Sequence, residues 1–141
     1  MIRFSGFLLT AVFAVLSLFH FYWAAGGTLG KRVAIPKIGS RPAFSPSPVS
    51  TILVAIALMV AMFIILGRLD VLGKKAPRWI FHWGTWGICV LFFLRAVGEF
   101  RLVGFFKQVR DTEFASWDTW LFSPLCLVIA VIAFALAFKE V

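Results

Sequence analysis

Four long stretches without a charged side chain constrain the fold of this chain more than any other feature. They cover residues 4–30, 42–67, 79–94 and 119–138. A helix needs about 20 apolar residues to cross about 30 Å of hydrocarbon, because each residue advances about 1.5 Å. The third stretch reaches that length if Arg95, near its end, extends its charged head toward the lipid headgroups. The pattern therefore predicts four transmembrane helices, over about residues 4–25, 50–68, 79–98 and 119–138.

The composition excludes a water-soluble domain. Of the 141 residues, 62% are hydrophobic and only 14% are charged, against about 25% charged in a typical soluble domain. A core of this size is too small to remove so much apolar surface from water. We therefore expect residues 1–141 to form one polytopic membrane domain. The expected fold class is an all-α membrane protein, a four-transmembrane-helix up-down bundle.

The segments between the expected spans differ in character. Residues 26–50 contain four prolines and four basic residues, which is typical of an extended, irregular loop. Residues 100–117 are different, because apolar residues recur there at the spacing of one helix face. These residues are Leu102, Phe105, Phe106 and Val109. This spacing predicts a short interfacial amphipathic helix before the fourth span.

The ends of the first stretch allow two interpretations. Arg3 and the small residues Ala24, Ala25 and Gly26 are compatible with a cleaved signal peptide. The length of the stretch and its aromatic end favour a transmembrane helix instead.

Basic residues are almost evenly divided between the two faces, and they are densest in residues 68–78. From that short loop we expect both termini in the cytoplasm.

The charge of the chain and the positions of its cysteines indicate which partners and cofactors to expect. The chain has 14 Lys and Arg against 6 Asp and Glu, a net charge of +8. Since no nucleic-acid-binding motif is present, we expect the basic residues to meet anionic membrane lipids and not nucleic acid. Cys89 and Cys126 lie inside apolar stretches at a spacing that fits no metal site. We expect no metal and no cofactor. Small residues at helix-packing spacings leave open whether the chain forms a homo-oligomer or joins a partner membrane protein.

Polar residues collect at one membrane face. In an up-down bundle, this face holds the ends of the first and third spans and the starts of the second and fourth. Arg95 and Glu99 are one helical turn apart, so they can pair with each other. Pairing matters because an unpaired charge in a span is costly by about a few kcal/mol. The expected polar vestibule consists of His20, Trp23, Arg95, Glu99, Arg101 and Asp118.

Several functions are compatible with such a vestibule. The first is binding of a lipid headgroup or a small amphiphile, with Arg95 holding its anionic group. The second is a small proton-coupled transporter that works as an oligomer, with Glu99 carrying the proton. The third is a non-catalytic accessory or scaffold subunit. An enzyme that uses His20 and Glu99 as acid and base is less expected, because no recognisable nucleophile or metal set is present; we assign no catalytic residue.

Two motifs carry a resemblance to a known family. The first is residues 20–27, His-Phe-Tyr-Trp-Ala-Ala-Gly-Gly. The second runs over residues 94–101 and 103–107 and continues with Asp118-Thr119 and residues 123–126. With these motifs the chain resembles an uncharacterised bacterial family of small four-helix integral membrane proteins, a domain of unknown function. Glu99 departs from the family pattern, which has an aspartate there. The resemblance implies a protein of the bacterial plasma membrane and brings no known activity or site residue.

Overall fold

The computed structural model describes residues 1–139 and consists almost entirely of helices. Four helical segments are long and apolar enough to cross a membrane. Three are single helices, α1 (Ile2–Ala24), α3 (Pro48–Arg68) and α4 (Arg78–Val97). The fourth extends over Glu113–Phe138 and is divided into α5 (Glu113–Trp117), a π-helical turn η1 (Asp118–Phe122) and α6 (Ser123–Phe138). The predicted all-α membrane protein with four spanning helices is confirmed.

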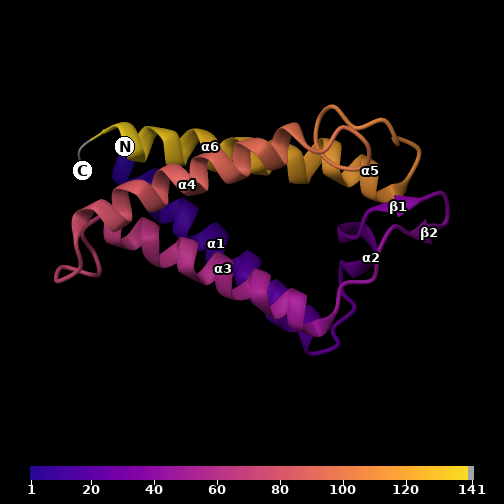
Figure 1. The fold of residues 1–141 in the computed structure, drawn as a ribbon, viewed down its shortest axis with the longest axis horizontal. Helices are drawn as coiled ribbons and strands as arrows, with labels where there is room; N and C mark the ends of the chain where they lie inside the picture. The colour runs from indigo at the N-terminus through magenta and orange to yellow at the C-terminus, as the bar shows by residue number, and fades with distance from the viewer. Residues whose placement is uncertain (140–141) are drawn as a thin grey trace.

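The long helices form two pairs that diverge from each other (Figure 1). Helix α1 lies along α3, and α4 lies along α6. Contacts of α3 with α4 and of α1 with α6 join the pairs, at the end where the chain termini lie (Figure 1). At the other end the pairs separate, and the segment between α1 and α3 extends across to α5. The bundle is therefore closed at one end and open between its helix pairs at the other.

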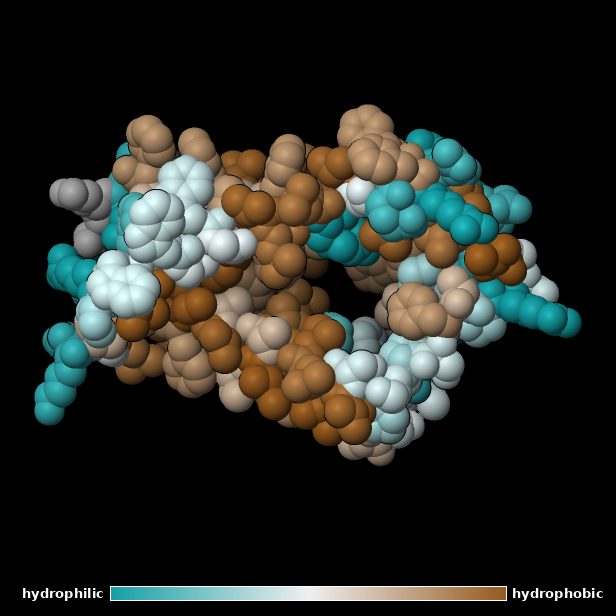
Figure 2. All heavy atoms as spheres, in the orientation of Figure 1, coloured by the Kyte–Doolittle hydropathy of each residue, from teal (hydrophilic) through white to brown (hydrophobic). Residues whose placement is uncertain are grey.

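The core lies where the two pairs meet. Its fully enclosed residues include Leu9 and Phe13 of α1, Ile65 of α3, and Ile129 and Leu136 of α6. In each spanning segment only 17–33% of the residues are buried within the protein, so most of the helical surface is left for lipid. Figure 2 shows this surface as mainly hydrophobic, with hydrophilic side chains gathered at the two ends.

Small residues allow the close helix contacts. Ala55 and Ala133 are completely buried, as expected where helices approach each other in lipid. The hydroxyl of Ser17 donates a hydrogen bond to the carbonyl of Ala55 over 2.8 Å, which joins α1 to α3. Within this chain, these small residues pack helices of the same molecule.

The first connection is largely irregular, as its prolines predict. It contains a single helical turn, α2 (Lys31–Ala34), and a minimal antiparallel hairpin of β1 (Lys37–Ile38) and β2 (Arg41–Pro42). A serine, Ser47, caps the start of α3 by accepting a hydrogen bond from the backbone nitrogen of Ser50 over 3.1 Å. The connection therefore ends at a defined helix cap.

The prediction of an amphipathic helix that contains Leu102, Phe105, Phe106 and Val109 is wrong. Residues 98–112 form an irregular loop, and the short helix before the fourth span is α5 instead, which runs directly into that span. Gly98 and Gly104 have positive φ angles of 86° and 90°, a backbone conformation that interrupts a helix and that glycine adopts readily. The apolar spacing does not mark a buried face, since Phe106 is 62% exposed.

We predict that Ala133→Leu destabilises the bundle by about 1–3 kcal/mol, because extra methyl groups do not fit a fully packed helix contact. Val131 offers a matched control, since 59% of this side chain is exposed on the same helix. Thermal unfolding in mild detergent should show a lowered Tm for Ala133→Leu and little change for Val131→Leu. Equal Tm values for the two variants would contradict the packing described above.

Candidate functional site

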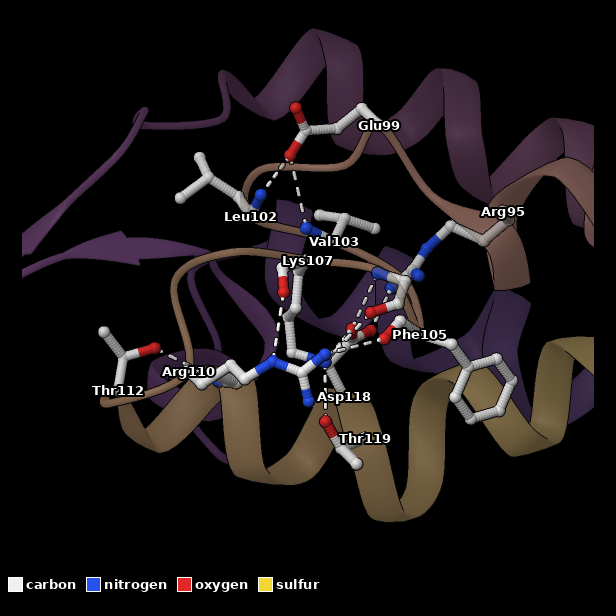
Figure 3. Close-up of polar contacts among 12 residues, drawn as sticks. Arg95, Glu99, Leu102, Val103, Phe105, Lys107, Arg110, Thr112, Asp118 and Thr119 are labelled. Atoms are coloured by element: carbon white, nitrogen blue, oxygen red, sulfur yellow. Dashed lines mark hydrogen bonds and ion pairs between the residues drawn. The ribbon is translucent and has the colours of Figure 1, made fainter.

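A buried carboxylate lies at the centre of the polar residues at the open end of the bundle (Figure 3). Asp118, the first residue of η1, is completely enclosed. Its Oδ1 accepts a hydrogen bond from the Arg95 guanidinium over 2.8 Å. Its Oδ2 accepts from the Gly104 backbone nitrogen over 2.8 Å and from Lys107 Nζ over 3.1 Å. Both carboxylate oxygens are therefore satisfied, as a buried charge requires.

Lys107 is the second buried charge of this cluster. Its side chain is 0% exposed, and its ammonium group also donates to the Gly104 carbonyl over 3.0 Å and to Thr119 Oγ1 over 2.6 Å. With Asp118, these acceptors use all three donors of the ammonium group. Arg110 donates from Nε to the Lys107 carbonyl over 3.1 Å, and this hydrogen bond holds the next turn of the loop beside Lys107.

The backbone of the loop brings these side chains together. After α4 ends, the chain turns back so that the Phe105 nitrogen donates to the Ala96 carbonyl over 2.8 Å. Gly98 and Gly104 touch at this crossing, and a Cβ atom on either residue would overlap the opposing backbone. The close crossing directs the Gly104 nitrogen at Asp118. Glycine is therefore required at both positions by space as well as by φ angle.

A π-helical turn presents Asp118 to the loop. Pro124 lies in the first turn of α6 and has no backbone N–H, so the regular pattern of helix hydrogen bonds is interrupted just before it. The wider turn η1 occupies this interruption and begins with Asp118. The local sequence thus explains why the carboxylate faces the loop over residues 98–112.

The cluster of Arg95, Lys107 and Asp118 carries a net positive charge, because two cations share one carboxylate. Arg95 is the accessible member, with 33% of its side chain exposed. Its Nη1 is enclosed without a hydrogen-bond partner among residues 1–139. This guanidinium therefore retains donor capacity that Asp118 does not use.

Arg95 lines a cavity of about 610 Å³ between the two helix pairs. The other lining residues are mostly apolar and come from α1, α3, α4 and α6, and His20 of α1 is also among them. Figure 2 shows a hollow in the molecular surface where the pairs diverge. A second cavity, of about 330 Å³, lies under the first connection and is lined by His20, Trp23 and Lys31. His20 and Val54 border both cavities.

The ring of His20 has a defined tautomer when it is neutral. Its Nδ1 lies 2.7 Å from the Leu16 carbonyl, which can only accept a hydrogen bond, so Nδ1 carries the proton. The other nitrogen, Nε2, then carries a lone pair. Trp23 packs its ring edge against His20 with 5.1 Å between centroids, and its Nε1 donates to the Leu29 carbonyl over 2.8 Å.

The six residues of the expected vestibule separate into three groups. His20 and Arg95 line the large cavity, and Trp23 lines the smaller one with His20. Asp118 is buried behind Arg95 and holds it in place. Glu99 and Arg101 are exposed and line neither cavity. The part of the chain described by the structure therefore supports a smaller site than the sequence suggests.

Arg95 pairs with Asp118 and not with Glu99, the partner that its helical spacing allows. The helix ends before Glu99, so the two residues are no longer on one helical face. Glu99 instead accepts hydrogen bonds from the backbone nitrogens of Leu102 and Val103 and lies apart from Asp118 (Figure 3). Its role in this structure is to hold the first turn of the loop.

Lys107 and Gly104 are the site residues that sequence reasoning missed. Helical spacing places Lys107 off the face formed by Leu102, Phe105, Phe106 and Val109, so it gives no sign that this residue is buried. The available signal was the pair of glycines, Gly98 and Gly104, which disfavours that helix. No periodic pattern connects Lys107 with Asp118, because their contact depends on the chain reversal.

The described residues contain no group of three or more His, Cys, Asp or Glu that could hold a metal ion. The site is instead a cationic guanidinium, fixed by a buried carboxylate, at the edge of an apolar cavity. Fold and site together define a small helical membrane protein with a buried ion cluster at one end.

The chain belongs to the family described as "Protein of unknown function (DUF3995)", whose model matches residues 13–133. This match confirms the resemblance to an uncharacterised family that the motifs indicate. No curated protein and no solved structure matches the chain.

We predict that Asp118→Asn destabilises the protein by about 3–5 kcal/mol, because it leaves the buried Lys107 and the half-buried Arg95 without a counter-charge. Asp111 in the same loop provides a matched control, since it is exposed, and Asp111→Asn should change stability by less than about 0.5 kcal/mol. Thermal unfolding and limited proteolysis of the loop over residues 98–112 measure the two effects. A loop equally protected in both variants would show that the ion cluster does not hold it.

Proposed function

We propose that this protein binds an anionic amphiphile, with its acidic group at Arg95 and its hydrocarbon part in the large cavity. The observation that carries the proposal is the position of Arg95, a partly exposed cation in the lining of an otherwise mostly apolar cavity of about 610 Å³. Ligand sites are commonly apolar with a few polar groups that fix orientation. This proposal retains the lipid headgroup or small amphiphile expected from the sequence.

The charge of the ion cluster supports an anionic ligand. Arg95 and Lys107 share only the carboxylate of Asp118, so one additional carboxylate or phosphate oxygen would balance the cluster. A guanidinium binds such groups through two parallel hydrogen bonds, which are among the strongest in proteins. Because Asp118 already fixes Arg95, little side-chain entropy remains to be lost on binding.

The lining supports a hydrocarbon tail. Leu16, Val54, Val60, Leu91 and Phe92 are among the apolar residues around the cavity. Ala57, Gly84 and Gly87 also line it. The space beside Gly87 is open, since a Cβ atom there would meet nothing within 4 Å. Such a tail would enter through the hollow between the helix pairs (Figure 2).

His20 supports recognition of a polar group near Arg95. Its Nδ1 is committed to the Leu16 carbonyl, so the lone pair on Nε2 can accept a hydrogen bond from a hydroxyl or a protonated acid. His20 borders both cavities. A ligand hydroxyl at their junction would satisfy this nitrogen.

We further propose a setting for this activity. The protein is a multi-pass protein of a bacterial plasma membrane with both termini in the cytoplasm, and the basic residues of 68–78 support that orientation. Its partners are then membrane lipids. Binding at Arg95 needs residues of one chain only, so the proposal does not depend on a homo-oligomer or on a partner membrane protein.

We predict that the protein purified in mild detergent carries an anionic lipid or fatty acid as a mass adduct in native mass spectrometry. Arg95→Gln should weaken adduct retention by roughly tenfold or more, because a charge-assisted hydrogen bond is lost. Ala57→Phe should displace the adduct by filling the cavity. Ile56→Phe is the matched control, since Ile56 is exposed on the same helix and does not line the cavity.

Each outcome decides between the functions that remain. An adduct that survives both Arg95→Gln and Ala57→Phe contradicts this site. A folded wild-type protein without any adduct, and without uptake of added oleate, favours the scaffold or accessory subunit. Proton-driven flux in liposomes that is lost in Glu99→Gln would favour the transporter.

A further inference from the structure

A second site lies at the opposite end of the bundle from Arg95. There, a cavity of about 510 Å³ is formed by the start of α1, the end of α3, the connection after it and the start of α4. We call it the basic cavity. The residues that line it are Arg3, Gly67, Asp70, Leu72, Gly73, Lys74, Ala76, Arg78 and Phe81. Three cations thus face one carboxylate, and none of these residues belongs to the site at Arg95.

Two helix N-termini meet at the basic cavity, and both carry a charge of the disfavoured sign. Arg3 lies in the first turn of α1, and Arg78 is the first residue of α4. Neither helix has an acidic residue in its first turn or a side-chain hydrogen bond to its cap. The N-terminal end of a helix is electropositive and has unpaired N–H groups, so a cation there is destabilising and an anion is stabilising.

The C-terminal end of α3 lies at the same face and has a charge of the favoured sign. Arg68 lies in the last turn of α3, where a cation is favoured. It donates hydrogen bonds to the carbonyls of Leu136, Ala137 and Lys139 at 3.0, 3.3 and 2.7 Å. The chain therefore places one arginine where helix electrostatics favour it, and two, Arg3 and Arg78, where they disfavour a cation and favour an anion.

The lining of the basic cavity is held in shape by neighbouring contacts. Arg78 donates to both oxygens of Asp70 at 3.1 and 3.3 Å, and Arg3 donates from Nη2 to the Leu69 carbonyl over 3.2 Å. The ring of Phe81 packs against Gly67 and Gly73, where a Cβ atom would collide with it. Each arginine uses one terminal nitrogen in these bonds, and its remaining N–H groups stay available for a ligand.

We propose that the basic cavity binds a phosphate group. Arg3, Lys74 and Arg78 against Asp70 give a net charge of +2, which matches the charge of about −2 on a phosphomonoester. Several cations and two helix N-termini around one space suit the oxygens of a phosphate better than the two of a carboxylate. The phosphate belongs either to the headgroup of an anionic lipid or to free inorganic phosphate.

The experiment titrates the full-length protein in neutral detergent by isothermal calorimetry. Its probes are inorganic phosphate, dioctanoyl phosphatidic acid and, as the zwitterionic comparison without net charge, dioctanoyl phosphatidylcholine. We expect saturable binding of the phosphatidic acid that weakens as salt is added. Binding of inorganic phosphate as well assigns the site to the phosphate group alone, and binding of the lipid only assigns it to the headgroup.

Neighbouring lysines give a matched pair of variants. Lys74 lines the basic cavity and Lys75 does not, although both are exposed. We expect Lys74→Ala and Arg78→Gln each to weaken binding by roughly tenfold, because each removes a charge-assisted hydrogen bond. Lys75→Ala should stay within about twofold, as a surface substitution. Equal weakening by Lys74→Ala and Lys75→Ala indicates attraction to net charge only and overturns the proposal, as does the absence of saturable binding to either phosphate probe.

The same titration separates this site from the one at Arg95. Arg95→Gln changes a residue at the other end of α4. It should leave the binding of inorganic phosphate unchanged, and any phosphatidic acid binding that it removes belongs to the amphiphile site. Failure of the amphiphile site therefore has no bearing on binding at the basic cavity. Loss in Arg95→Gln of inorganic phosphate binding, or of the phosphatidic acid binding that Arg78→Gln weakens, would place the phosphate at Arg95 and overturn the assignment to the basic cavity.

Discussion

The burial of one carboxylate, Asp118, determines the structure of the whole open end of the bundle. A charge removed from water at the boundary of a membrane needs both an opposite charge and hydrogen bonds to its remaining lone pairs. Arg95 and Lys107 supply the charge, and the Gly104 nitrogen supplies a further hydrogen bond. To deliver these donors, the chain after α4 must reverse and cross its own backbone, which only glycine at 98 and 104 allows. The irregular loop is thus a consequence of satisfying a buried charge, and the two cations needed to hold it leave the cluster positive.

The cluster joins α4 to the fourth span, and this explains why the molecule opens between its helix pairs and not within them. Within each pair, buried polar contacts reinforce apolar packing: Arg95 with Asp118 in one, and Ser17 with the Ala55 carbonyl in the other. Across the open end, the first connection reaches α5 mainly through Glu113, which pairs with Arg32 over 3.1 Å and lies 3.9 Å from Lys37. Arg32 and Glu113 are exposed, with 78% and 40% of their side chains accessible, and exposed pairs contribute little, about 0–1 kcal/mol. The helix pairs are therefore joined across the open end by exposed charges that hold them together only weakly.

The sequence predicts the four helices well because the membrane imposes a length and a composition that local reading can detect. It also places His20, Arg95 and Asp118 at one face, since this follows from counting helices alone. It fails at residues 98–112, where the apolar spacing of Leu102, Phe105 and Phe106 resembles a helix face. The structure of this loop depends instead on two contacts that local spacing does not reveal. One is the pairing of Lys107 with Asp118, eleven positions away, and the other is the backbone crossing at Gly98 and Gly104. Helical spacing also allows Arg95 to pair with Glu99, but that spacing does not continue past Gly98, where the helix ends.

The net charge of +8 acquires a structural meaning when the two ends of the bundle are compared. At the open end, one carboxylate is shared by two buried or half-buried cations. At the other end, Arg3 and Arg78 lie against the electropositive starts of two helices. At both ends the fold therefore leaves positive charge that the described residues do not balance, because cations outnumber carboxylates three to one in the lining of the basic cavity and two to one in the ion cluster. If an anion binds at either end, as we propose, it stabilises the folded protein as well as occupying a site.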